Sequence, residues 1–358
     1  MKITKLAFAC LVMPILYLQT SQVNAGCNIP EFMAADMVEG YLADTGQTGC
    51  ANDKSMGDKA VYMTDNRFDA YQARGAIRQA ARSTAALILK SSLQKKGDYY
   101  VPAYNYTLRD TKWCEGESFL NQPVLANCTA FLVSNDTLVT AGHCFRNDNP
   151  EEQKLITIDK YYVVFGYEML SKNKANTRFP AKDVYSISKE LEVKKDKTKD
   201  WAVVRLNRAV NDRQIFEFKA GEIKKGTKLT LFGYPVGLPL KIANGGKVLE
   251  NQRGKTVFAT NVDAFQGNSG SPVLNSEGLR LSPPRFIVEG ILVAGAKDFK
   301  EVKGCKRIEP CRAINISYNG GNCSSEIVTK INKVVATDSS ASSSPSAPVS
   351  NGTFRDLV

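Results

Sequence analysis

The chain has 358 residues, 43% of them hydrophobic and 23% charged, and a formal net charge of +11. This is an ordinary globular composition, long enough for one large or two smaller domains with a well-buried core. The basic residues are scattered rather than gathered in one stripe with aromatic residues, which argues against nucleic-acid binding and favours contact with anionic surfaces or acidic substrates.

Residues 1–25 have the parts of a secretory signal peptide. Lys2 and Lys5 precede an apolar run from Leu6 to Leu18, and Ala25 closes the polar stretch that follows. The run is too short to span a bilayer, so we expect cleavage and no stable membrane anchor afterwards. The sequence therefore predicts a secreted protein, periplasmic or extracellular.

The cysteine count fits export. Cys10 leaves with the signal peptide, and the remaining number is even, which predicts disulfides. The eight are Cys27, Cys50, Cys114, Cys128, Cys144, Cys305, Cys311 and Cys323. We expect no metal and no cofactor, because the chain holds one histidine and no paired C-x-x-C motif.

The two ends differ from the middle of the chain. Residues 26–60 are rich in Gly, Asp and Met and show no clear period, which suggests an N-terminal extension or propeptide. Residues 336–358 are rich in Ser, Ala and Pro and are predicted to form a disordered tail, because they cannot bury enough apolar surface.

Short apolar runs separated by Gly, Asn, Asp and Pro fill the middle of the chain. Strands are expected at 85–89, 128–133, 138–140, 161–165, 201–206, 228–232, 257–262, 272–274 and 286–293. Helices are expected over 69–82 and, after a capping serine, over 324–335. Many short strands with little helix predict an all-β sandwich or barrel.

A serine lies between two glycines in the stretch Gln266-Gly267-Asn268-Ser269-Gly270. Glycine lets the backbone bend sharply, so Ser269 can stand exposed while nearby N–H groups converge. A hydroxyl nucleophile beside convergent donors suits chemistry that builds an oxyanion on a substrate carbonyl. The motif alone is equally compatible with a turn between strands, so the interpretation depends on a base and an acid elsewhere.

The base is predicted to be His143, the only histidine, which follows an apolar strand in the stretch TAGHC. Cys128 lies sixteen residues before Cys144, and a disulfide between them would hold the imidazole in place. A neutral imidazole near a serine hydroxyl can take its proton during attack.

The acid is predicted to be Asp200, which directly precedes the apolar strand 201–206. A carboxylate there can orient the imidazole and stabilise its charged form. Asp183 and Asp196 are the alternatives, and both lie in charged, loop-like surroundings.

These three stretches resemble the histidine, aspartate and serine blocks of the trypsin/chymotrypsin superfamily of serine endopeptidases. The blocks are TAGHC at 140–144, DWAVVRL at 200–206 and GNSGSPV at 267–273, in that family's order. The likeness is greatest to bacterial secreted members, including the glutamyl-endopeptidase branch. The stretch VYMTDNR at 61–67 resembles the start of the mature enzymes of that branch. The resemblance spans residues 61–335 and implies two antiparallel six-stranded β-barrels with the active site in the cleft between them.

The resemblance also implies roles for single residues. Ser269 would be the nucleophile, His143 the general acid/base and Asp200 its orienter, while the N–H groups of Gly267 and Ser269 would form the oxyanion hole. The substrate-binding wall would include Asp263, Gln266, Val293 and Gly295.

Asp263 leaves the specificity open. It lies six residues before Ser269, where trypsin-like enzymes carry the carboxylate that selects Lys or Arg through a charge-assisted contact. Alternatively, Asp263 pairs with a nearby basic side chain or faces solvent. Glutamate specificity is not expected, because glutamyl endopeptidases use a second histidine that this chain lacks.

The residue before Ser269 bears on activation. Animal digestive members carry an aspartate there that pairs with a newly freed N-terminus, whereas Asn268 cannot form this ion pair. We hypothesise instead a zymogen cut between Ala60 and Val61, which would remove Cys27 and Cys50 together.

The sequence as a whole therefore predicts a secreted, monomeric serine endopeptidase that acts on protein or peptide substrates. The alternative is a catalytically silent scaffold of the same fold that serves as a binding protein. An esterase of the α/β-hydrolase type is disfavoured, because its chain order is Ser, acid, His.

Overall fold

The computed structural model describes residues 62, 65–146, 157–196, 198–218, 221–295, 299–308, 310 and 325–335. The predicted signal peptide, the 26–60 segment and the Ser-rich tail lie outside these residues, as do Cys27, Cys50, Cys311 and Cys323. Within the described residues, no helix has the length and apolar character needed to cross a membrane.

The first half of the chain closes into a six-stranded antiparallel barrel in the order β11-β12-β6-β5-β2-β7. Its strands are β2 (Thr84–Leu89), β5 (Cys128–Leu132), β6 (Thr137–Thr140), β7 (Tyr161–Phe165), β11 (Val184–Lys195) and β12 (Asp200–Leu206). All six residues of β2 are buried, which explains why this strand reads as a continuous apolar run.

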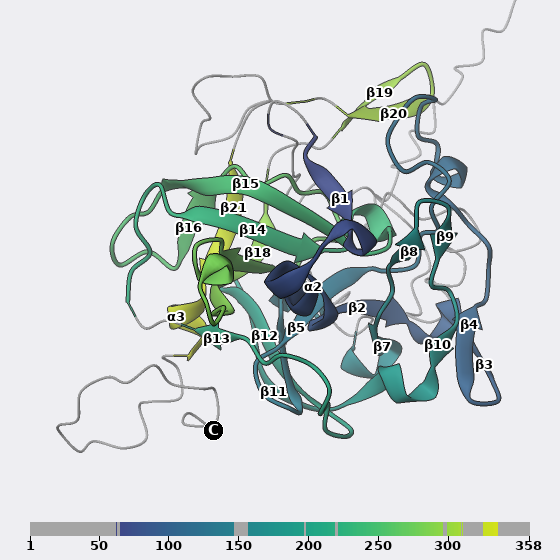
Figure 1. Cartoon of the computed structure of the whole chain (residues 1–358), viewed down its shortest axis with the longest axis horizontal. Coiled ribbons are helices and arrows are strands. Elements are labelled where there is room, and N and C mark those ends of the chain that lie inside the picture. The colour runs from purple at the N-terminus through teal and green to yellow at the C-terminus, as the bar shows by residue number, and fades with distance from the viewer. Residues whose placement is uncertain are drawn as a thin grey trace, which may run out of the picture.

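The second half forms another barrel, beside the first (Figure 1). Six antiparallel strands run in the order β15-β14-β17-β18-β21-β16, and pairing of β15 with β16 closes the ring. They are β14 (Lys228–Gly233), β15 (Lys241–Glu250), β16 (Val257–Thr260), β17 (Pro272–Asn275), β18 (Ile287–Ala294) and β21 (Glu326–Lys330). The predicted pair of six-stranded antiparallel barrels is therefore confirmed.

Shorter elements decorate the barrels. β1 (Arg67–Asp69) extends the second barrel along β15, and β13 (Glu217–Phe218) pairs in parallel with β18. The others are β3 (Leu93–Lys96), β4 (Tyr99–Pro102), β8 (Met169–Ser171), β9 (Lys174–Ala175), β10 (Phe179–Pro180), β19 (Phe299–Val302), β20 (Cys305–Ile308), α2 (Gly75–Arg82) and α3 (Ile331–Val335).

Both expected helices are present but shorter than predicted. The helix over 69–82 is confirmed only from Gly75, after a 3₁₀ turn at Ala70–Gln72. The helix over 324–335 is wrong in its first half, where β21 takes its place and only α3 remains helical. The β-branched run in β21 favours a strand, and its pairing with both β16 and β18 completes the barrel.

Two disulfides lie in the described part of the chain. Cys128–Cys144 closes a short loop of the first barrel and confirms the predicted pairing. Cys114–Cys305 joins the segment before the first barrel's β5 to β20, across 191 residues.

Candidate active site

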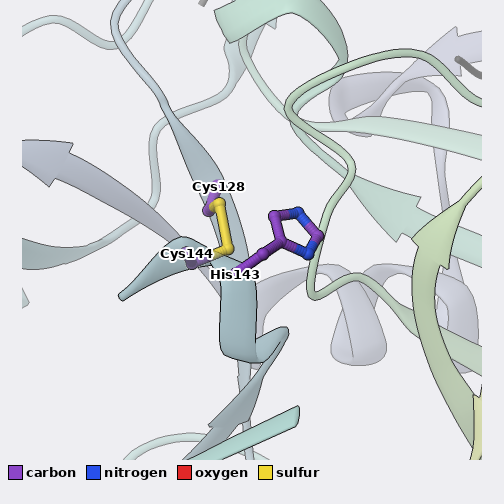
Figure 2. A group of neighbouring side chains, drawn as sticks. All are labelled: Cys128, His143 and Cys144. Atoms are coloured by element: carbon purple, nitrogen blue, oxygen red, sulfur yellow. A yellow bond between two sulfur atoms is a disulfide. The ribbon is translucent and has the colours of Figure 1, made fainter. Parts of the chain in front are cut away.

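His143 lies on a 3₁₀ turn, Gly142–Cys144, that is separated from β6 by one residue, Ala141. The disulfide from Cys144 to Cys128, the first residue of β5, fixes this turn to the neighbouring strand. Figure 2 shows the imidazole ring projecting to one side of the disulfide. Closing a loop of this length stabilises a fold by about 3 kcal/mol, so the ring stands on a rigid base.

Asp200 begins β12 and holds the histidine through both carboxylate oxygens. Its Oδ2 lies 2.7 Å from His143 Nδ1, and its Oδ1 accepts a hydrogen bond of 3.0 Å from the backbone N–H of His143. With Nδ1 engaged in this way, Nε2 is the ring nitrogen left to exchange protons. The arrangement orients the imidazole for acid–base work.

The alternative carboxylates have other partners. Asp183 forms an ion pair with Arg213, and Asp196 accepts hydrogen bonds from the backbone N–H groups of Thr198 and Lys199. The structure therefore brings Asp200, rather than either alternative, to the imidazole.

The charge on Asp200 is stabilised by its neighbours. Burial alone would raise the pKa of this carboxyl, but the imidazole of His143 and the ammonium of Lys195 together lower the pKa below its ordinary value. Asp200 is therefore a carboxylate, able to stabilise a positive charge on His143, throughout the neutral range.

The loop that carries Ser269 lies between β16 and β17 and depends on two glycines. Gly267 and Gly270 both have φ of 85°, a region that side chains rarely adopt. A Cβ at Gly267 would lie 2.4 Å from the carbonyl oxygen of Tyr234, and one at Gly270 would lie 2.0 Å from that of Thr129. Only glycine fits either position.

Hydrogen bonds fasten this loop to the first barrel. The backbone N–H of Thr129 donates to the carbonyl of Ser269 at 2.8 Å, and the Thr129 hydroxyl donates to the carbonyl of Gly267 at 2.9 Å. Because Thr129 directly follows Cys128, the serine loop is held against the strand that also anchors the histidine turn. Within the described residues the N–H of Gly267 has no acceptor, which suits a donor for an oxyanion.

The residues predicted to line the substrate site gather near this loop with different surroundings. Gln266 adjoins Gly267, while Val293 lies on β18, which ends one residue before Gly295. Asp263 is only 1% exposed and accepts hydrogen bonds from the backbone N–H groups of Tyr62 at 2.8 Å and Asn66 at 3.0 Å. It therefore does not face solvent, and the binding roles of these four residues stay predictions.

Burial raises the pKa of Asp263 to about 6, although the two backbone donors act in the opposite direction. The carboxyl thus changes its charge in a mildly acidic range.

A second buried carboxylate was missed from the sequence. Glu326 on β21 is fully buried, and a Cβ at Gly295 would lie 2.1 Å from its Oε2. The hydroxyl of Tyr62 donates to its Oε1 at 3.4 Å. In the sequence, Glu326 is an acidic residue directly before a run of β-branched residues, which indicates a strand. The prediction of a helix over 324–335 prevented this interpretation.

Cys128, His143 and Cys144 place three atoms of metal-binding type within 4.8 Å of one another (Figure 2). Zinc needs cysteine as thiolate, and here both sulfurs are joined in a disulfide. This group therefore does not suit a metal ion.

Residues 128–280 match the family model of the trypsin-like peptidase domain. Among solved structures, a Glu endopeptidase in complex with MPD is 15% identical over 78% of this chain and 96% of its own, with a TM-score of 0.47. An inactive serine-to-alanine mutant of Rv3671c from M. tuberculosis H37Rv is 13% identical over 73% of this chain and 88% of its own, with a TM-score of 0.37. A search of curated protein sequences found no match.

The matched segment contains all three residues predicted for the triad, together with their supporting disulfide. It also begins with the first barrel's β5 and runs through the serine loop into the second barrel. The chain therefore contains a segment similar to the trypsin-like peptidase domain, on a fold of two six-stranded antiparallel barrels.

Proposed function

We propose that the chain is a secreted serine endopeptidase that hydrolyses peptide bonds with Ser269, His143 and Asp200. The observation that carries the proposal is the contact of 2.7 Å between His143 Nδ1 and Asp200 Oδ2, made by the only histidine in the chain. The serine loop, held to Thr129 beside the same disulfide, supplies the nucleophile at this junction.

In the first half of the reaction, Ser269 Oγ attacks the scissile carbonyl carbon while His143 Nε2 takes the hydroxyl proton. The imidazolium is stabilised by Asp200, and the negative oxygen of the tetrahedral intermediate accepts hydrogen bonds from the N–H groups of Gly267 and Ser269. The imidazolium then gives its proton to the leaving amine as the C–N bond breaks, which leaves an acyl-enzyme.

In the second half, water attacks the acyl carbon and gives a proton to His143. The tetrahedral intermediate collapses, the ester bond to Ser269 breaks, and the proton returns to the serine oxygen. The carboxylic acid product leaves, and the enzyme is restored without a cofactor.

A fluorophosphonate probe and a peptide-hydrolysis assay test this function together. The wild-type protein is expected to carry the probe on Ser269, and Ser269→Ala and His143→Ala are expected to retain only the turnover that oxyanion binding provides. Ser171→Ala, which changes an exposed serine on β8, is the matched control and should behave as wild type. Near-normal turnover by either active-site variant would contradict the proposal.

Activation by a cut between Ala60 and Val61 is part of the proposal. Its support is Tyr62, which is 6% exposed and bound to Asp263 through its backbone N–H. Tyr62, the second residue after the cut, is therefore buried and held to the loop between β16 and β17. N-terminal sequencing of secreted, active protein should give Val61 as the first residue, whereas a start at Gly26 would refute the cut.

Cleavage after Lys or Arg is the specificity that we propose. Two buried carboxylates, Asp263 and Glu326, lie at the predicted substrate-binding wall, where negative charge favours a basic side chain. Fluorogenic peptides that differ only in the residue before the cut provide the test. A preference for Glu over Arg would overturn this specificity and leave the proposed hydrolysis intact.

A further inference from the structure

Lys195 is the last residue of β11 and lies directly across the hairpin from Asp200, the first residue of β12. The connecting turn is tight, since the backbone N–H of Asp196 donates to the carbonyl of Lys199 at 2.8 Å. Register in such a hairpin is fixed by the turn, so the pairing of Lys195 with Asp200 is built into the backbone.

The side chains of Lys195 and Asp200 also lie close to each other. Lys195 Nζ lies 3.9 Å from Asp200 Oδ2, the same oxygen that contacts His143 Nδ1 at 2.7 Å. The side chains of Lys195 and Asp200 are 19% and 15% exposed, so water screens this contact only in part. An ammonium group, a carboxylate and an imidazole therefore meet at one oxygen atom.

The backbone of Asp200 is fixed as well, because the Thr329 hydroxyl on β21 donates to its carbonyl at 3.2 Å. Other charged groups on the packed elements form ion pairs away from Asp200. These pairs are Arg146 with Glu190, Lys194 with Glu192, and Lys330 with Glu222. Lys195 is thus the described cation that acts on the histidine–aspartate pair directly.

We infer that Lys195 is a positioning residue of the triad: its ammonium holds the Oδ2 side of Asp200 and keeps the imidazole of His143 neutral to lower pH. An imidazolium at His143 would lie near the ammonium and be repelled by it, while the neutral ring would not. The ammonium also offsets part of the negative charge of Asp200, so the carboxylate attracts a protonated imidazole less strongly. The consequence for the proposed hydrolysis, on which this inference rests, is activity that extends to more acidic pH.

The single histidine makes the test direct. In protein labelled on histidine with ¹⁵N, one imidazole titrates, and NMR follows its protonation without any substrate. Removing the charge in Lys195→Met should move the midpoint of this titration upward by about half to one pH unit, the size expected when one nearby unit charge is lost from a partly screened site.

Two variants frame this result. Lys195→Arg keeps the positive charge, so its midpoint should stay within about 0.2 pH units of the wild-type value. A shift in Lys195→Met but not in Lys195→Arg would show that the charge, rather than side-chain packing, sets the midpoint. Lys194→Met removes the neighbouring, more exposed lysine and should leave the midpoint unchanged. If Lys195→Met does not fold, Lys195→Gln at this partly exposed position gives the same comparison. An unchanged midpoint in the charge-removing variants, or an equal shift in Lys194→Met, would overturn the inference.

The pH profile of kcat/KM separates this inference from the proposed function. The acidic limb should move upward in Lys195→Met by the same amount as the NMR midpoint. Wild-type protein that titrates as expected but hydrolyses no peptide would refute the proposed function alone. Active enzyme whose acidic limb does not move in Lys195→Met would refute the role of Lys195 alone.

Discussion

Replacing Asp263 with alanine should detach the N-terminal segment from the second barrel. The carboxylate accepts hydrogen bonds from the backbone N–H groups of Tyr62 and Asn66. Tyr62 is buried, and a buried N–H that loses its acceptor costs about 1–3 kcal/mol. Asn66 is exposed, so water can replace its acceptor and adds little. We expect Asp263→Ala to lower the free energy of unfolding by about 1–3 kcal/mol at pH 7.5.

The cost should grow in acid. The pKa of Asp263 is raised to about 6 in the folded protein, above its ordinary value of 3.8, so the folded state binds this proton first. Wild-type stability therefore gains from this group as pH falls through 6 toward 4, and the gain is absent above 6. At pH 4.5 the gain is about 2 kcal/mol, and Asp263→Ala, which has no carboxyl, should lack it.

Urea unfolding at pH 7.5 and 4.5, in a Ser269→Ala background that prevents self-digestion, measures both quantities. Asp98→Ala, which removes an exposed carboxylate, is the control and should change stability by less than about 0.5 kcal/mol. Limited proteolysis should cut Asp263→Ala near Tyr62 faster than wild type. Stability that is unchanged at both pH values would contradict the anchoring role of Asp263.

Three further predictions concern the candidate site. Asp200→Asn should lower kcat by about 10⁴-fold, because an amide N–H facing Nδ1 forces the proton onto Nε2, and a loss under tenfold would contradict the orienting role. The double variant Cys128→Ala/Cys144→Ala should have a free energy of unfolding about 3 kcal/mol lower than the disulfide-bonded wild type. An unchanged thermal unfolding temperature would refute this. Gly270→Ala should cost more than about 1 kcal/mol, because its Cβ would strike backbone, whereas Gly254→Ala, with similar φ and open space, should cost less.

Patterns within a few neighbouring residues were enough to predict several strands, one disulfide and the three stretches of the candidate site. The strands that bury apolar runs, such as β2 and β12, were predicted close to their observed bounds. The Cys128–Cys144 disulfide could also be predicted from the sequence, because the two cysteines are only sixteen residues apart. The histidine, aspartate and serine stretches could be identified because each resembles a family block within a few consecutive residues.

Other features depend on partners far along the chain. β11 and β15 were missed, since charged residues in the first and two adjacent glycines in the second hide any strand pattern. β21 was predicted as helix, because only its pairing with β16 and β18 selects the strand. Asp263 meets Tyr62 across 201 residues, which no local pattern indicates.

The contact between Lys195 and Asp200 shows a subtler limit. The two residues are close in sequence, but their pairing depends on the register of the hairpin between β11 and β12. A shift of one residue would turn the lysine to the other face of the strand, so the interaction could not be inferred without the structure.

The central claim is that Ser269 is a nucleophile activated by His143. Mass spectrometry of fluorophosphonate-treated protein tests it most directly, with wild type, His143→Ala and Ser269→Ala compared at equal folded concentration. We predict a single adduct on the peptide that contains Ser269, strongly reduced in His143→Ala and absent in Ser269→Ala. Folded, disulfide-bonded wild-type protein that leaves Ser269 unmodified would contradict the claim and identify a silent scaffold.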